Sequence, residues 1–191
     1  MLKTKSALIR LKFLANAGNG DPVALATMWF GDFEKRGIEI GKFDALFSGV
    51  HNLETMLVMQ QAHDAYVIGL LDAVPVLCRI ALEEELTIRY LAANGLIATV
   101  AAGNPFRTFV DGRTRASLEN LIQWAHTTSP PILTATTLPL ARDVQEVGND
   151  YAHAYAKIRV TKPMTGTGNL FTNTRALEIY EKALKVFDQM P

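Results

Sequence analysis

Four polar side chains recur on one face of a predicted helix in the second half of the chain. The helix covers residues 140–158, and Arg142, Glu146, Asn149 and His153 follow one another at steps of four, three and four. At about 100° per residue, these steps place the four residues in one column along the helix. An arginine supplies charge for a phosphate, an asparagine orients it, and a histidine exchanges a proton near neutral pH. The column therefore holds the side-chain types needed to bind a phosphodiester and act on it.

The same column is also typical of a helix face that is simply solvated. Arg142 and Glu146 are four residues apart, which is the spacing of an ordinary surface ion pair on a helix. Both interpretations of the column, a phosphate site and a solvated face, remain open from the spacing alone.

Two further stripes of the 140–158 helix predict how it packs. The apolar stripe should face the core and consists of Leu140, Val144, Val147, Tyr151, Tyr155 and Ile158. A stripe of small residues consists of Ala141, Gly148 and Ala152. Glycine destabilises a helix by about 1 kcal/mol relative to alanine. Its presence at position 148 therefore predicts either a close approach of another helix or a local bend.

A second pair of charged residues lies in the most apolar part of the chain. Arg79 and Glu83 are one helical turn apart and have aliphatic neighbours. Charged residues in such a helix are expected to be paired. Two interpretations stay open: an internal ion pair that orients two helices, or a pair that faces the polar column and contacts substrate.

The remaining sequence predicts helices throughout and no convincing strand. Helices are expected over residues 6–18, 21–37, 43–50, 53–93, 117–126, 140–158 and 174–190. The second half of the 53–93 region is apolar nearly all round, which predicts a long central helix kinked or split near Pro75. We therefore expect an all-α fold, a single compact bundle of six or seven helices in one domain over residues 1–191.

Net charge and apolar runs restrict the function classes. Lys plus Arg and Asp plus Glu are both 19, so any nucleic-acid binding must come from a local patch. Lys3, Lys5 and Arg10 interrupt the first apolar stretch, which argues against a signal peptide. The longest apolar region, residues 65–82, contains Asp72, Pro75 and Arg79 and is too polar for a membrane span.

The cysteine and histidine content excludes two more classes of site. Cys78 is the only cysteine and lies in an apolar run, so we expect a buried thiol, no internal disulfide and a cytoplasmic setting. The histidines at positions 51, 63, 126 and 153 have no ligand partners at zinc spacing. We expect no metal, no other cofactor and no membrane partner.

Two stretches resemble the HEPN superfamily, helical bundles common in prokaryotic defence and toxin–antitoxin systems, and in particular its branch of uncharacterised stand-alone domains. Residues 73–86, AVPVLCRIALEEEL, are similar to that branch's Arg-x-x-Leu-Glu helix at Arg79, Leu82 and Glu83. Residues 144–153, VQEVGNDYAH, are similar to its Gly-Asn-x-x-x-His helix at Gly148, Asn149 and His153. The resemblance covers a core of residues 64–158 and leaves residues 1–60 outside; the helix over 174–190 completes the bundle.

The resemblance implies a homodimer that binds RNA or a nucleotide, and in catalytic members a metal-independent endoribonuclease. Of the catalytic residues, it carries over only His153 and Asn149; Arg142, on the same stripe of the helix, is expected to supply charge. From the polar column and the pair on the central helix, we expect substrate contacts at Arg79, Glu83 and Glu146. The arginine of the catalytic members should fall at position 146, 147 or 148, where this chain has Glu146, Val147 and Gly148. Whether this chain cleaves RNA is therefore left open.

Three functional hypotheses follow from these patterns, and the weakest of them is a small-molecule pocket between the central helix and the last helix. The first is an HEPN-like domain of a defence or toxin–antitoxin type system that binds RNA or a nucleotide at the polar column. The second is a non-catalytic protein-interaction or dimerisation module of a defence or regulatory complex, in which the column is a hydrogen-bond network or a dimer seam.

Overall fold

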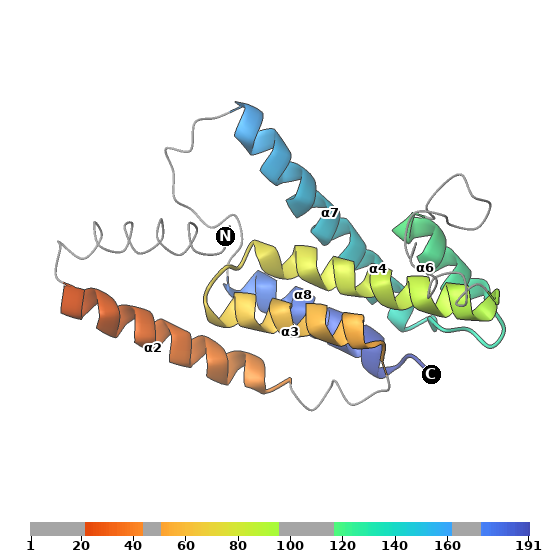
Figure 1. Cartoon of the computed structure of the whole chain (residues 1–191), viewed down its shortest axis with the longest axis horizontal. Helices are drawn as coiled ribbons and strands as arrows, with labels where there is room; N and C mark the ends of the chain where they lie inside the picture. The colour runs from red at the N-terminus through yellow and green to blue at the C-terminus, as the bar shows by residue number, and fades with distance from the viewer. Residues whose placement is uncertain (1–21, 44–50, 96–116, 162–172) are drawn as a thin grey trace.

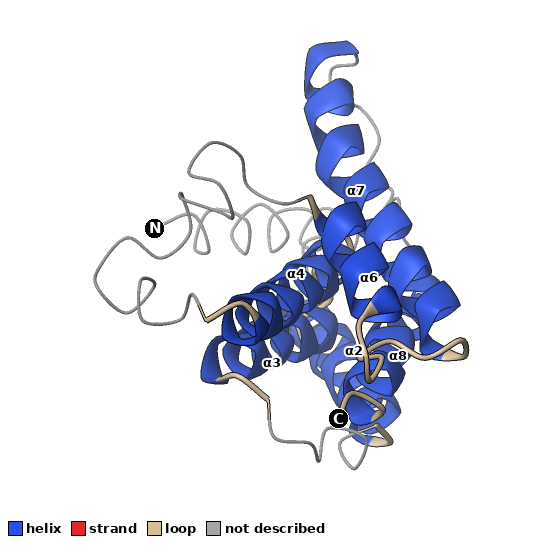
Figure 2. Ribbon diagram, turned by 90° about the vertical axis from the view of Figure 1, so that its right-hand side faces the viewer, coloured by secondary structure: helices blue, strands red, loops and turns tan. Residues whose placement is uncertain are grey.

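The described part of the chain is entirely helices and connecting turns. The computed structural model describes residues 22–43, 51–95, 117–161 and 173–191, and no strand occurs among them (Figures 1 and 2). Their helices are α2 (Pro22–Gly41), α3 (Leu53–Val67), α4 (Ala73–Ala93), α6 (Leu118–Thr127), α7 (Thr137–Thr161) and α8 (Asn173–Asp188). The predicted all-α bundle is confirmed. The helices predicted over residues 6–18 and, beyond Phe43, over 43–50 lie outside the described residues.

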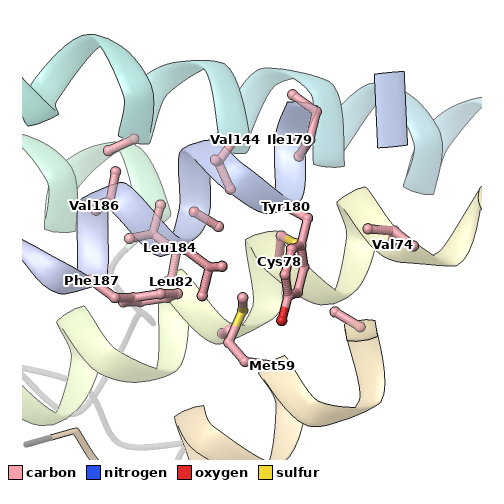
Figure 3. Close-up of a cluster of buried hydrophobic side chains, with 14 of the residues drawn as sticks. Met59, Val74, Cys78, Leu82, Val144, Ile179, Tyr180, Leu184, Val186 and Phe187 are labelled. Atoms are coloured by element: carbon pink, nitrogen blue, oxygen red, sulfur yellow. The ribbon is translucent and has the colours of Figure 1, made fainter. Parts of the chain in front are cut away.

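Helix α4 is the centre of the bundle. It packs against α3, α6, α7 and α8, and its inner side chains Val74, Cys78 and Leu82 are buried (Figure 3). On α8, Ile179, Leu184 and Phe187 close the same core and are also buried. Burial raises the pKa of the Cys78 thiol, so this cysteine is an inert apolar residue, as the sequence predicts.

The apolar region over residues 53–93 is split, which is one of the two predicted outcomes, but the split is at Gly69 and not at Pro75. It forms two helices, α3 and α4, that pack side by side as an antiparallel hairpin (Figure 1). The turn between them is made by Gly69, which has a φ of 77° and lets the amide of Leu70 reach the carbonyl of Ala65 at 2.7 Å. Pro75 lies in the first turn of α4, where its missing amide hydrogen removes no helical bond.

Helix α2 continues four residues beyond its predicted end at Gly37. Ile40 is fully buried, and the Tyr66 hydroxyl donates a hydrogen bond to Glu39 at 2.8 Å. The Arg36 Nε also donates to the carbonyl of Val67 at 3.0 Å. These tertiary contacts outweigh the helix-ending tendency of Gly37.

Helix α7 starts three residues before its predicted first residue and projects from the bundle. Thr134 and Thr137 exchange backbone-to-hydroxyl hydrogen bonds at 2.9 and 3.3 Å, which fixes the start of α7. Burial and the nearby Asp72 carboxylate raise the pKa of Tyr151, so the start of α4 lies at this level of α7. The later residues of α7, to Thr161, extend past the other described helices (Figures 1 and 2).

None of the described helices combines the length and apolar character that crossing a bilayer requires. The described segments therefore agree with the expectation that the apolar region over residues 65–82 is not a membrane span.

Candidate functional site at the crossing of α4 and α7

The two stretches that carry the HEPN resemblance meet where α4 crosses α7. Gly148 of α7 lies directly against Arg79 of α4, and a Cβ atom at position 148 would lie 2.9 Å from the carbonyl oxygen of Pro75 and would overlap the Cβ of Arg79. Ala141 of the same stripe is fully buried. The close approach predicted from the small-residue stripe is confirmed at Gly148, whereas Ala152, the third residue of that stripe, is exposed. The contact at Gly148 fixes which face of α7 contacts α4.

Arg79 and Glu83 form an ion pair within α4. The Arg79 Nη2 and the Glu83 Oε2 are 3.3 Å apart, and the two side chains are 24% and 12% exposed. The Nε of Arg79 is buried and has no hydrogen-bond acceptor among the described residues. The interpretation of Arg79 and Glu83 as an ion pair is therefore confirmed.

The column on α7 begins on the open side of this crossing. Arg142 and Glu146 are exposed, and no ion pair joins them in the described structure. Asn149 follows Gly148 directly and is half-buried, so its side chain lies about 100° around the helix from the contact with α4. Arg142 is therefore an exposed cation available to a ligand, and Asn149 lies at the edge of the helix crossing.

His153 lies one turn after Asn149 on the same stripe of α7. Its side chain is outside the described part of the structure, so the role predicted for this imidazole stays a prediction.

Helix α8 packs against a neighbouring side of α7. Lys182 of α8 contacts Asp143 of α7 at 2.8 Å and Glu178 of its own helix at 2.7 Å. The hydrogen bonds from these two carboxylates raise the pKa of Lys182. Since Asp143 follows Arg142 by one residue, α8 meets α7 about 100° away from the column.

A second polar cluster, which the sequence did not reveal, lies between α3, α4 and the residues after α8. Glu85 of α4 accepts hydrogen bonds from the Arg89 Nε at 2.7 Å and from the backbone amide of Asn52 at 3.2 Å. The His51 Nδ1 lies 3.5 Å from the same carboxylate, and its ring meets that of Phe187 edge to face at 5.6 Å. The side chains of His51 and Glu85 are only 1% and 3% exposed.

Glu85 is held as a carboxylate in spite of its burial. Burial alone would raise its pKa, but the hydrogen bond and charge of Arg89 and the amide of Asn52 together lower it. An ionised carboxylate only accepts hydrogen bonds, so the His51 Nδ1 must be the donor in this pair. Arg89 also donates to the backbone carbonyl of Pro191, and the cluster therefore ties the last residues to α4.

Only one part of this cluster has a signal in the sequence. Glu85 and Arg89 are four residues apart on the helix, the spacing of an ion pair. His51 lies 34 residues before Glu85, and only the α3–α4 hairpin brings the two together. The ring of Phe187 covers the cluster, so these side chains stabilise the fold and do not form an open site.

The described residues contain no group of three or more histidine, cysteine or acidic side chains that could hold a metal ion. Comparisons with models of known protein families, with curated proteins and with solved structures find no match for this chain.

Proposed function

We propose that this chain binds the phosphate of RNA or of a nucleotide at the column on α7, next to the crossing with α4. The observation that carries the proposal is the contact of Gly148 with Arg79, which brings the helix of Arg79 and Glu83 beside that of Asn149. Two separate stretches that resemble one family thus meet at one place. The exposed and unpaired Arg142 on the same stripe supplies the charge that an anion needs.

Each residue of the column has a separate role in this proposal. Arg142 contacts the phosphate, Asn149 orients it, and Glu146 accepts hydrogen bonds from ribose hydroxyls. Arg79 and Glu83 hold the α4 side of the site, and Arg79 adds positive potential. If the protein cleaves RNA, His153 transfers the proton, and no metal takes part.

The biological setting follows from the resemblance. We propose a cytoplasmic protein of a prokaryotic defence or toxin–antitoxin type system that acts as a homodimer. The end of α7 projects past the other described helices (Figure 1), and in this proposal a second copy packs against it.

A second candidate function is a non-catalytic protein-interaction or dimerisation module. The ion pair of Arg79 with Glu83 favours it, because a guanidinium already paired with a carboxylate has fewer donors for a phosphate. In this case the column is part of an interface, and RNA does not bind.

The salt dependence of RNA binding tests the proposal. Anisotropy of a fluorescein-labelled single-stranded RNA should show binding at about 50 mM salt that weakens steeply towards about 200 mM. The Arg142→Gln variant should bind more weakly and lower the slope of log K against log salt by about 0.7, the value for one phosphate contact on a single strand. ATP as a competitor distinguishes a nucleotide site from an RNA site.

The control for this measurement is Lys42→Gln, which removes one positive charge from the exposed turn that follows α2. It should leave both the affinity and the slope close to those of the wild type. If neither RNA nor ATP binds at low salt, the interaction module is the better description. In the same preparation, RNA cleavage that is lost in His153→Ala would establish the histidine as the proton-transfer group.

A further inference from the structure

The exposed large apolar side chains of this protein are confined to one part of the bundle. Among the described side chains, every large hydrophobic residue that is exposed belongs to α2, to α3 or to the turn after α3: Phe30, Phe33, Ile38, Leu53, Met56, Leu57 and Ile68. The described side chains of α4, α6, α7 and α8 include none. Three of them, Leu53, Met56 and Leu57, follow one another within the first turns of α3 and form a patch apart from those of α2; an exposed apolar patch of this kind marks an interaction site.

Helix α3 has an outer side that is apolar over its first turns and polar further along, at Gln60, Gln61 and Asp64. Its inner residues Met59 and Ala62 are buried against the bundle. Its outer residues Leu53, Met56 and Leu57 are 67%, 42% and 53% exposed, and their spacing of three and four places them on one face. Three large apolar side chains that are exposed this close together give the first turns of this face the composition of a contact surface.

The charges of α3 indicate which partner this face fits. Glu54 and Asp64 are exposed near the apolar residues, and α3 contains no lysine or arginine. If a second copy docked through the same face, the carboxylates of the two copies would lie near one another and repel. A partner with lysine or arginine beside its apolar residues would instead meet opposite charges.

We propose that the outer face of α3 binds an amphipathic helix of a partner protein, with apolar residues every three to four positions and basic residues along its edges. Leu53 and Leu57 act as fixed apolar contacts, and the flexible Met56 side chain adapts to the partner's shape. Glu54 and Asp64 orient the basic edges. This surface is on α3 and not on α7, so the inference stands independently of the phosphate site.

The test uses a synthetic helical peptide of about five turns, roughly 18 residues, with leucine at the apolar positions and lysine along both edges. A second peptide has glutamate in place of each lysine. Anisotropy of the labelled lysine peptide should report saturable binding to the full chain, and the glutamate peptide should bind at least about tenfold more weakly. Equal binding of the two peptides would overturn the proposal.

Two matched variants locate the binding. Leu57→Gln should weaken binding of the lysine peptide by about tenfold or more, because its side chain is half exposed and central to the face. Ile38→Gln makes the same kind of change on the exposed side of α2 and should leave the affinity unchanged. Equal effects of the two variants would overturn the assignment to α3.

Sedimentation velocity of the chain without peptide tests the remaining alternative, that a second copy of the chain binds this face. Self-association that Leu57→Gln abolishes would show that a second copy occupies the face, and the proposal would be wrong. Both substitutions are on exposed side chains, and unchanged far-UV circular dichroism confirms that the variants fold.

Discussion

Replacing Gly148 with alanine is expected to lower the free energy of unfolding by about 1–3 kcal/mol, the usual range for an overpacked contact. The new Cβ would meet the Cβ of Arg79 and the backbone oxygen of Pro75, and neither atom can rotate away. α4 and α7 must therefore separate. The same change should weaken RNA binding, because it moves Asn149 away from Arg79. Chemical denaturation followed by circular dichroism measures the first effect.

Gly37 provides the matched control for this substitution. It lies inside α2, and nothing lies within 4 Å of the place that a Cβ would take. Gly37→Ala should therefore raise the free energy of unfolding by up to about 1 kcal/mol, since alanine favours a helix over glycine by that amount. The two substitutions are chemically identical and should have opposite signs. A stabilising Gly148→Ala would show that α4 and α7 are not in close contact.

Replacing Glu85 with glutamine is expected to lower the free energy of unfolding by about 3 kcal/mol, the size of effect seen when one partner of a buried ion pair is removed. The Glu85 carboxylate is 3% exposed and accepts hydrogen bonds from both Arg89 and Asn52. Glutamine has one acceptor oxygen and no charge, so one donor loses its partner. Urea denaturation at neutral pH measures the change.

The pH dependence of this loss follows from the direction of the pKa shift. The pKa of Glu85 is lowered in the folded protein, so its contribution is complete above the unfolded value of about 4.3 and is lost as pH falls through the folded value. The difference between wild type and Glu85→Gln should therefore be largest at neutral pH and narrow below about pH 4. The control Glu34→Gln, on the exposed surface of α2, should change stability by less than about 0.5 kcal/mol at any pH. A difference that stays constant down to pH 3 would contradict an ionised Glu85.

The packing faces of the helices could be predicted from their periodicity. The spacing of Ala141 and Gly148 indicated a close helix contact, and the structure places Gly148 against Arg79. The apolar character of Cys78 and its neighbours indicated a central helix, and α4 is that helix. Such patterns are informative because a helix face repeats within one local segment.

The breaks between helices were less predictable. Proline was expected to interrupt the 53–93 region at Pro75, but the interruption is at Gly69, where a left-handed backbone conformation is needed. Proline in the first turn of a helix loses no hydrogen bond, so the position of the helix start decides its effect. That start depends on how α3 packs on α4, which local sequence does not encode.

The candidate site was predicted in part. The column and the pair of Arg79 with Glu83 were identified from spacing, and the structure confirms that pair and the meeting of the two helices. The cluster around Glu85 was missed because His51 and Asn52, which complete it, lie more than 30 residues before Glu85 in the chain. Long-range polar contacts of this kind depend on the tertiary fold and leave no periodic signal.

The most direct test of the phosphate site is the affinity of Asn149→Asp for the labelled single-stranded RNA at low salt. The change keeps the size of the side chain and puts a negative charge at the edge of the α4–α7 crossing. Gln123→Glu adds the same charge to the exposed side of α6 and is the control. We expect the wild type and Gln123→Glu to bind RNA with the same affinity and Asn149→Asp to bind at least about tenfold more weakly. If Asn149→Asp binds RNA with the affinity of the wild type, the phosphate is not bound beside Asn149.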